Sequence, residues 1–237
     1  QGTGQQDTLS GGVFVYADAN AGSGKTLNVS NASVVSGPLT VTGNYTINFE
    51  ANTTSLITPA PVTVSGLSAD NKVYNANSVA ILSGTPTVTG ILAGDSSSLS
   101  GSATAGTFAS ANVGTGIAVT ANLGGLSLSN TNYYVAGVTS PLRANITAAP
   151  VTISGLNASN KVYDTTDVAT LTGTATLAGV ISGDNLSITA GNVTAVFASN
   201  NVGTGIAVTP NLGGLSLSNS NYYIANLSSS LSANITP

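Results

Sequence analysis

Several residue types are missing from this chain of 237 residues. Cysteine, methionine, tryptophan and histidine do not occur, and only four basic and eight acidic residues are present, which gives a net charge of −4. Without cysteine there can be no disulfide, thiolate metal site or thiol nucleophile, and histidine is the commonest general base. The sequence therefore argues against an enzyme, and we expect no catalytic residue and no cofactor.

Positive charge and long apolar runs are scarce as well. The four cations, Lys25, Lys72, Arg143 and Lys161, are scattered along the chain, whereas nucleic-acid binding needs several phosphate contacts from clustered basic residues. No run of about 18 apolar residues could cross a membrane as a helix. We expect no nucleic-acid partner and no membrane insertion. Because no signal peptide begins at Gln1, we expect a processed product or a fragment of a longer protein.

The residues that are abundant indicate strands. About 41% of the chain is hydrophobic, rich in valine and isoleucine, and much of the rest is Ser, Thr, Asn and Gly. Apolar and polar residues alternate in segments such as 62–64, 126–128 and 151–153, and Gly and Asn separate these segments. Alternation with a period of two is typical of strands with one buried face. Seven or eight short strands in about 90 residues predict an all-β fold of immunoglobulin-like β-sandwich type.

The chain repeats itself at a spacing of 89 residues. Ala60-Pro61-Val62-Thr63 returns as Ala149-Pro150-Val151-Thr152, and roughly 60% of the paired positions are identical without gaps. This period is too long for a solenoid unit but suits a small domain. We therefore predict two β-sandwich repeats, at 60–148 and 149–237. For brevity they are called copy 1 and copy 2.

The residues before copy 1 resemble part of another repeat. Asn20-Ala21-Gly22 is similar to Asn112-Val113-Gly114, and Asn44-Tyr45 is similar to Asn132-Tyr133. We predict a flexible lead-in at 1–12 and a partial or divergent β unit at 13–59. The joints between units are short and contain proline, which restricts the backbone. Such joints predict a semi-rigid rod rather than a flexible string.

The order of motifs within each copy resembles a known family. Asn160-Lys161-Val162-Tyr163-Asp164-Thr165 is followed by Val168-Ala169-Thr170-Leu171, Gly183-Asp184, Phe197 and Asn201-Val202-Gly203-Thr204-Gly205. This series resembles the YDG-type repeat of large bacterial surface proteins, including filamentous-haemagglutinin-like adhesins. The glycine of the family's name motif is replaced by Ala76 in copy 1 and Thr165 in copy 2. The resemblance implies a stalk or adhesive role at the cell surface and no catalytic residues.

Two carboxylates are the only candidates for a metal site. Asp95 and Asp184 follow glycine at equivalent positions, and an aspartate in such a turn can bind Ca²⁺ together with backbone carbonyls. No dense loop of Asp and Asn surrounds either residue, so turn capping is the simpler interpretation.

Aromatic residues recur at fixed repeat positions, for which we expect structural roles: Tyr74, Tyr163, Tyr133, Tyr222, Phe108 and Phe197. Tyr133-Tyr134 and Tyr222-Tyr223 form adjacent pairs, and strands alternate their faces, so one ring of each pair should be buried and the other exposed. The buried hydroxyl should bond to upstream backbone, as in a tyrosine corner. The exposed ring could stack on a sugar.

Asn-x-Ser/Thr sequons mark candidate glycosylation sites in a secreted chain. They occur at Asn28, Asn31, Asn44, Asn52, Asn145, Asn157, Asn185, Asn192, Asn226 and Asn234. A chain so rich in Asn, Ser and Thr also produces sequons by chance.

These observations leave three hypotheses for function. The first is an extracellular structural or adhesive array of a bacterial surface protein, whose affinity comes from many weak contacts. The second is a filament subunit in which the incomplete N-terminal unit exchanges a strand with a copy of itself. The third is a carbohydrate-binding module that uses exposed Tyr and Asn. We expect the partners to be neighbouring repeats, copies of the chain, or a surface glycan or host ligand.

Overall fold

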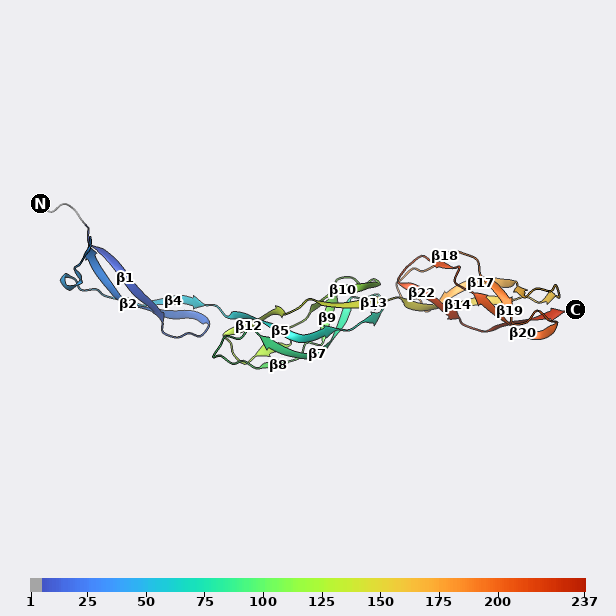
Figure 1. The fold of residues 1–237 in the computed structure, drawn as a ribbon, viewed down its shortest axis with the longest axis horizontal. Coiled ribbons are helices and arrows are strands. Elements are labelled where there is room, and N and C mark those ends of the chain that lie inside the picture. The colour runs from blue at the N-terminus through green and yellow to red at the C-terminus, as the bar shows by residue number, and fades with distance from the viewer. Residues whose placement is uncertain (1–5) are drawn as a thin grey trace. The chain divides into compact units, whose positions relative to one another are not determined.

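The computed structural model describes residues 6–237, and the regular elements of these residues are all strands apart from one short 3₁₀ helix at Thr42–Asn44 (Figure 1). The all-β prediction is confirmed, whereas the immunoglobulin-like arrangement of the sheets stays a prediction. No helix in the described part of the chain is long and apolar enough to span a membrane.

The described residues group into two compact units. Unit 1 contains the chain up to Gly66 together with Thr85–Ala103 and Leu123–Ser140, and unit 2 contains Leu67–Gly84, Thr104–Asn122 and Pro141–Pro237. The strands β5 (Ala60–Ala69) and β7 (Val79–Thr89) contribute residues to both units. The boundaries of the units thus pass through copy 1, and the boundaries predicted from the sequence at 59/60 and 148/149 stay a prediction.

Unit 1 begins with a four-stranded antiparallel sheet. Its strands are β1 (Thr8–Tyr16), β2 (Gly22–Ser36), β3 (Leu39–Thr40) and β4 (Asn52–Ile57). Because β1 starts at Thr8, the predicted lead-in at 1–12 is wrong for residues 8–12, where glycine at 11 and 12 takes positive φ within the strand. Residues 1–5 lie outside the described part of the chain.

The rest of unit 1 is formed by copy 1. The first half of β5 pairs in parallel with β12 (Tyr133–Val138), and β8 (Leu99–Gly101) pairs with β11 (Leu126–Leu128). Val62 and Val64 in β5 are each only 1% exposed, while Thr63 between them is half-buried. The alternation seen in the sequence therefore marks the buried face of this strand.

Unit 2 begins with the other half of copy 1. Its strands follow the order β7, β9 (Ala105–Phe108), β10 (Gly114–Ala121), β13 (Leu142–Thr147) and β6 (Lys72–Val73). The pairs along this order are antiparallel except that of β13 with β6, which is parallel.

Copy 2 repeats these pairings within unit 2. One sheet has the order β17 (Leu171–Ala178), β14 (Ala149–Ala158) and β22 (Tyr222–Leu227). A second sheet has the order β15 (Lys161–Val162), β23 (Leu231–Thr236), β20 (Gly203–Asn211), β19 (Thr194–Phe197) and β16 (Val168–Ala169). A small pair joins β18 (Ile188–Ala190) to β21 (Ser216–Leu217).

The core of copy 2 lies on the second sheet. Phe197, Val208, Leu231 and Ile235 are buried together with alanines of the same strands. Val151 and Ile153 of β14 are fully buried in the first sheet. Small side chains allow close contact between strands, and the few large ones fill the remaining space.

Glycine is required where the strands bend. Gly155 in β14 has φ of 83°, and a Cβ at this position would lie 2.3 Å from the carbonyl oxygen of Thr174. Gly66 in β5 has the same environment, with the carbonyl oxygen of Thr85 at 2.3 Å. At Gly155 the pairing of β14 with β17 shifts in register, and at Gly66 the burial pattern of β5 changes. A β-bulge with a glycine at positive φ produces such a bend.

Candidate functional site

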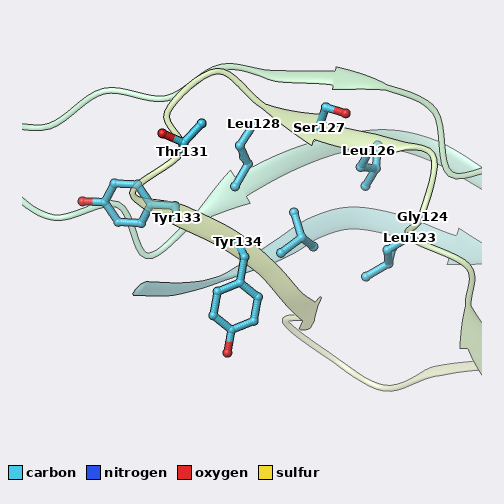
Figure 2. Close-up of a pocket in the computed structure, with 9 residues that line it drawn as sticks. Leu123, Gly124, Leu126, Ser127, Leu128, Thr131, Tyr133 and Tyr134 are labelled. Carbon is cyan, nitrogen blue, oxygen red and sulfur yellow. The ribbon is translucent and has the colours of Figure 1, made fainter. Parts of the chain in front are cut away.

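The adjacent tyrosines of β12 divide between the interior and the surface, as predicted. Tyr133 is 5% exposed and Tyr134 is 51% exposed, and Tyr222 and Tyr223 of β22 show nearly the same values, 4% and 50%. Figure 2 shows the rings of Tyr133 and Tyr134 leaving the strand in different directions. Each copy thus presents one accessible phenol ring beside a buried one.

The buried ring is fixed by its hydroxyl group. The Tyr133 hydroxyl donates to the Asp95 carboxylate at 2.6 Å and accepts from the backbone N–H of Leu92 at 3.2 Å. The hydroxyl bonds to upstream backbone, but Leu92 lies 41 positions earlier, whereas a tyrosine corner reaches only a few residues upstream, so the tyrosine corner stays a prediction. The hydrogen bond to the carboxylate, followed by burial, raises the pKa of Tyr133 above its usual value. The hydroxyl therefore stays protonated and serves as a link between strand and turn.

An open groove lies beside this tyrosine pair. Leucines of the segment 123–128 form one side, and Thr131 with the two tyrosines forms the other; the groove measures about 600 Å³ (Figure 2). Leu126 and Leu128 are half-buried, so the floor is apolar while Ser127 and the Tyr134 hydroxyl offer polar groups. An apolar surface with a few polar groups and an accessible aromatic ring suits the face of a sugar.

Copy 2 contains the same groove. Leu215, Leu217 and Tyr223 take the places of Leu126, Leu128 and Tyr134, in a volume of about 400 Å³. The chain therefore carries two similar candidate binding grooves, one in each unit.

Tyr74 joins copy 1 to copy 2 within unit 2. Its hydroxyl donates to the Asp184 carboxylate at 2.8 Å, and the Tyr222 hydroxyl donates to the same oxygen at 2.6 Å. The two rings meet edge to face with their centres 5.4 Å apart. The bond to Asp184, followed by burial, raises the pKa of Tyr74; for Tyr222 burial is the larger cause. This arrangement gives Asp184 a structural partner from each copy.

A pair of asparagines completes the same joint. The Asn221 side chain is 7% exposed, accepts from the backbone N–H of Val113 at 2.8 Å and donates to Asn112 Oδ1 at 2.9 Å. Unit 1 repeats the arrangement, because Asn132 accepts from the N–H of Ala21 at 2.7 Å and donates to Asn20 at 2.9 Å. A buried amide with both groups satisfied is costly to disrupt.

The lysine of each Lys-Val-Tyr motif organises the following loop. Lys161 Nζ donates to Asp164, to the carbonyl oxygen of Thr166 and to that of Val168, at 2.7–3.1 Å. Lys72 does the same in copy 1, where Asn75 takes the place of the aspartate. In this loop Ala76 and Thr165 have φ of 60° and 68°. The family's glycine stands at this position, which explains why its motif contains one.

The aromatic ring of a buried phenylalanine lies close to each of these lysines. Phe108 is 2% exposed and Phe197 is 3% exposed, and the ammonium groups of Lys72 and Lys161 lie 5.5 and 5.7 Å from their ring centres. Both rings thus contribute to the core and to a cation–π contact. Tyr163, in contrast to Tyr74, is 46% exposed.

Asp95 and Asp184, the candidate metal ligands, each bind tyrosine hydroxyls. Over residues 6–237 no group of three or more acidic side chains is arranged to hold a metal ion. The Ca²⁺ hypothesis therefore gains no further ligand from the described geometry.

The sequon asparagines have different surroundings. Asn145 and Asn234 accept from the N–H groups of Gly116 and Gly205, at 2.7 and 2.8 Å. Asn52 accepts from Thr54 and Ser55. Asn28, Asn44, Asn157, Asn185, Asn192 and Asn226 remain candidates with Asn31, which has φ of 58°. Glycosylation stays a prediction.

Family models identify the repeat. The model of the YDG domain matches residues 58–140 and again 147–230, which together make up more than half of the chain. The chain belongs to the YDG domain family. The resemblance seen in the sequence is therefore confirmed, and the two matched segments correspond to the two copies.

No curated protein matches the chain. A solved structure of FdeC, described as a broadly conserved Escherichia coli adhesin eliciting protection against urinary tract infections, is 14% identical, with 98% of this chain and 85% of that chain covered. Its TM-score of 0.27 is too low to support a common fold.

The asparagine pairs at the joints, Asn20 with Asn132 and Asn112 with Asn221, were not predicted from the sequence. One set of asparagines stands before Ala-Gly or Val-Gly, at Asn20, Asn112 and Asn201. The other set stands before the tyrosine pairs, at Asn132 and Asn221. The two sets recur together along the chain. This shared recurrence was the available signal that they form pairs.

Proposed function

We propose that the chain is an extracellular adhesive repeat array of a bacterial surface protein, without catalytic activity. Membership in the YDG family and the recurrence of one exposed-tyrosine groove in both copies support this function. The array acts as a stalk that displays the grooves, and its ligand is a glycan of a cell surface. Each groove binds weakly, and several acting together give useful avidity.

The decisive experiment removes the two exposed rings together. The double variant Tyr134→Ala and Tyr223→Ala should lower binding of the purified chain to a glycan array and to cultured epithelial cells by about tenfold or more, because stacking on the sugar is lost. Tyr16→Ala is the matched control, since Tyr16 is 40% exposed on β1, outside both grooves. Unchanged binding by the double variant would refute the groove as the adhesive site.

A second candidate function is self-assembly through the N-terminal sheet. Among the described residues of β1–β4, Val34 is the one buried hydrophobic residue. Four large apolar side chains of the same strands are 59–66% exposed: Leu9, Phe14, Leu39 and Leu56. An apolar sheet with open edges invites pairing with another copy. We infer that strand exchange between N-terminal sheets joins chains into a filament.

Sedimentation over a hundredfold dilution tests this second function. Filament subunits should associate at high concentration and separate on dilution, and Phe14→Asp should shift the equilibrium to monomer by placing a charge on the contact. Leu92→Asp is the control, because Leu92 is 64% exposed in copy 1. A monomer at every concentration contradicts the proposal.

A further inference from the structure

The backbone around Tyr163 and Asn201 in copy 2 makes the same local hydrogen bonds as the backbone around Tyr74 and Asn112 at the joint between the copies. The backbone N–H of Tyr74 donates to Thr147 O at 2.8 Å, and that of Tyr163 donates to Thr236 O at the same distance. The N–H of Asn112 donates to Ser110 Oγ at 3.1 Å, and that of Asn201 to Ser199 Oγ, also at 3.1 Å. The local structure that positions the joint is therefore already present.

The two ends differ in what covers them. Tyr74 is 7% exposed because copy 2 packs against it, whereas Tyr163 is 46% exposed. Val113, which is 38% exposed, donates its N–H to Asn221, and its counterpart Val202 is 51% exposed. Copy 2 thus presents a phenol, an amide side chain and a backbone N–H in the arrangement that copy 1 uses to hold its neighbour.

We propose that Tyr163, Asn201 and Val202 form a docking surface for a further YDG repeat joined directly after Pro237. The occupant needs the groups that copy 2 offers to copy 1: a carboxylate like Asp184 and an amide like Asn221. The inference deepens the proposed array by naming the contacts that join its members.

The short connection between copy 1 and copy 2 favours a covalently joined repeat over a second, separate chain as the occupant. In the joint within unit 2, β13 ends at Thr147 and β14 begins at Ala149, so a single residue separates them. In a second copy of this chain, the amide of copy 1 that would receive the surface is Asn132, which is already bonded to Asn20 and Ala21.

The docking contacts are strong enough to order the joint. A phenol bonded to a carboxylate is a charge-assisted hydrogen bond, which is roughly twice as strong as a neutral one. The buried amide adds two bonds whose loss would leave polar groups unsatisfied. A repeat that lacks either group should remain tethered but not docked.

The test appends a third repeat, residues 149–237, after Pro237 of the full chain. Hydrogen exchange followed by NMR should show the Val202 N–H slowed at least tenfold relative to the present chain, because the appended amide accepts from it.

The control carries Asp184→Asn and Asn221→Ala in the appended repeat only. It keeps the covalent connection and should restore fast exchange at Val202. If Val202 exchanges at the same rate in all three chains, or if the present chain dimerises through this face, the proposal is overturned.

A variant of the present chain keeps the test valid should the appended repeat fail to fold. Asn221→Ala should speed exchange of the Val113 N–H about tenfold and leave Val202 unchanged. Protection of Val113 that does not depend on Asn221 would contradict the joint itself. Glycan binding through Tyr134 and Tyr223 is measured separately, so failure of docking and failure of adhesion are distinguishable.

Discussion

At the scale of single residues, the loop after each Lys-Val-Tyr motif contains backbone strain. Thr165 has φ of 68°, and a β-branched side chain rarely adopts this conformation. The Lys161 ammonium group compensates by bonding four oxygens of the loop. The loop therefore keeps the family's conformation although its glycine is missing.

Replacing Thr165 by glycine should stabilise copy 2. We expect Thr165→Gly to raise the free energy of unfolding by about 0.5–1 kcal/mol, because relief of the strain exceeds the added entropy of the unfolded chain. Urea unfolding followed by circular dichroism measures this, since the chain has no tryptophan. Thr194→Gly, in strand β19, is the control and should destabilise. A loss of stability in Thr165→Gly would contradict the prediction.

The acid dependence of the same loop should differ between the copies. The Lys161 ammonium group, with the N–H and hydroxyl of Thr166, lowers the pKa of Asp164 from 3.8 to about 2. A depressed carboxyl pKa contributes stability above pH 3.8 that is lost as the pH falls through 2. Copy 1 has Asn75 at this position and should show no such titration.

NMR of the Asp164 carboxyl carbon should give a midpoint near pH 2, and Asp164→Asn should remove the acid-induced change in the loop. A midpoint near 3.8 would show that the contact with Lys161 is not formed in solution.

At the scale of elements, the strands are stabilised by apolar alternation on one face and hydroxyl pairs on the other. The hydroxyl oxygens of Ser65 in β5 and Thr87 in β7 are 2.8 Å apart. Those of Ser154 in β14 and Thr176 in β17 are 2.7 Å apart. Cross-strand pairs of this kind contribute a few tenths of a kcal/mol each. They allow an exposed sheet face with very few charges.

The bend in β14 should depend on its glycine. Gly155→Ala should cost on the order of 2–4 kcal/mol, because the new Cβ would lie 2.3 Å from Thr174 O in addition to the strain of positive φ. Gly183→Ala is the matched control: its φ is 96°, but no atom lies within 4 Å of the added Cβ, so about 1 kcal/mol is expected. Thermal unfolding compares the two, and equal costs would rule out the steric argument.

The strands and the buried tyrosines were predictable because both depend on short-range patterns. Val62-Thr63-Val64 alternates apolar and polar residues, and the adjacent residues Tyr133 and Tyr134 must point to opposite faces of a strand. The contact of Tyr74 with Asp184 could not be predicted, since 110 positions separate them and both looked like features of local turns. The start of β1 was missed because its glycines suggested a loop.

At the scale of the whole molecule, the low charge should make stability nearly independent of salt. In the described part of the chain the ion pairs are Lys25 with Asp18 and Lys161 with Asp164. Between 0.05 and 1 M NaCl the melting temperature should change by less than about 3 °C, since little charge is screened. Ammonium sulfate should raise it, because excluded salts strengthen apolar burial. A large response to NaCl would indicate unrecognised electrostatic contributions.

The parallel pairings of copy 2 bear on how a tethered chain responds to tension. Its first strand, β14, pairs in parallel with β22, and its last strand, β23, pairs in parallel with β15. When the two ends of the copy are pulled apart, the hydrogen bonds of these pairs lie across the direction of force and are loaded in shear. Several bonds must then break together rather than one after another. We therefore expect such a copy to unfold slowly under tension, because forced unfolding is governed by the unfolding rate and not by the equilibrium stability.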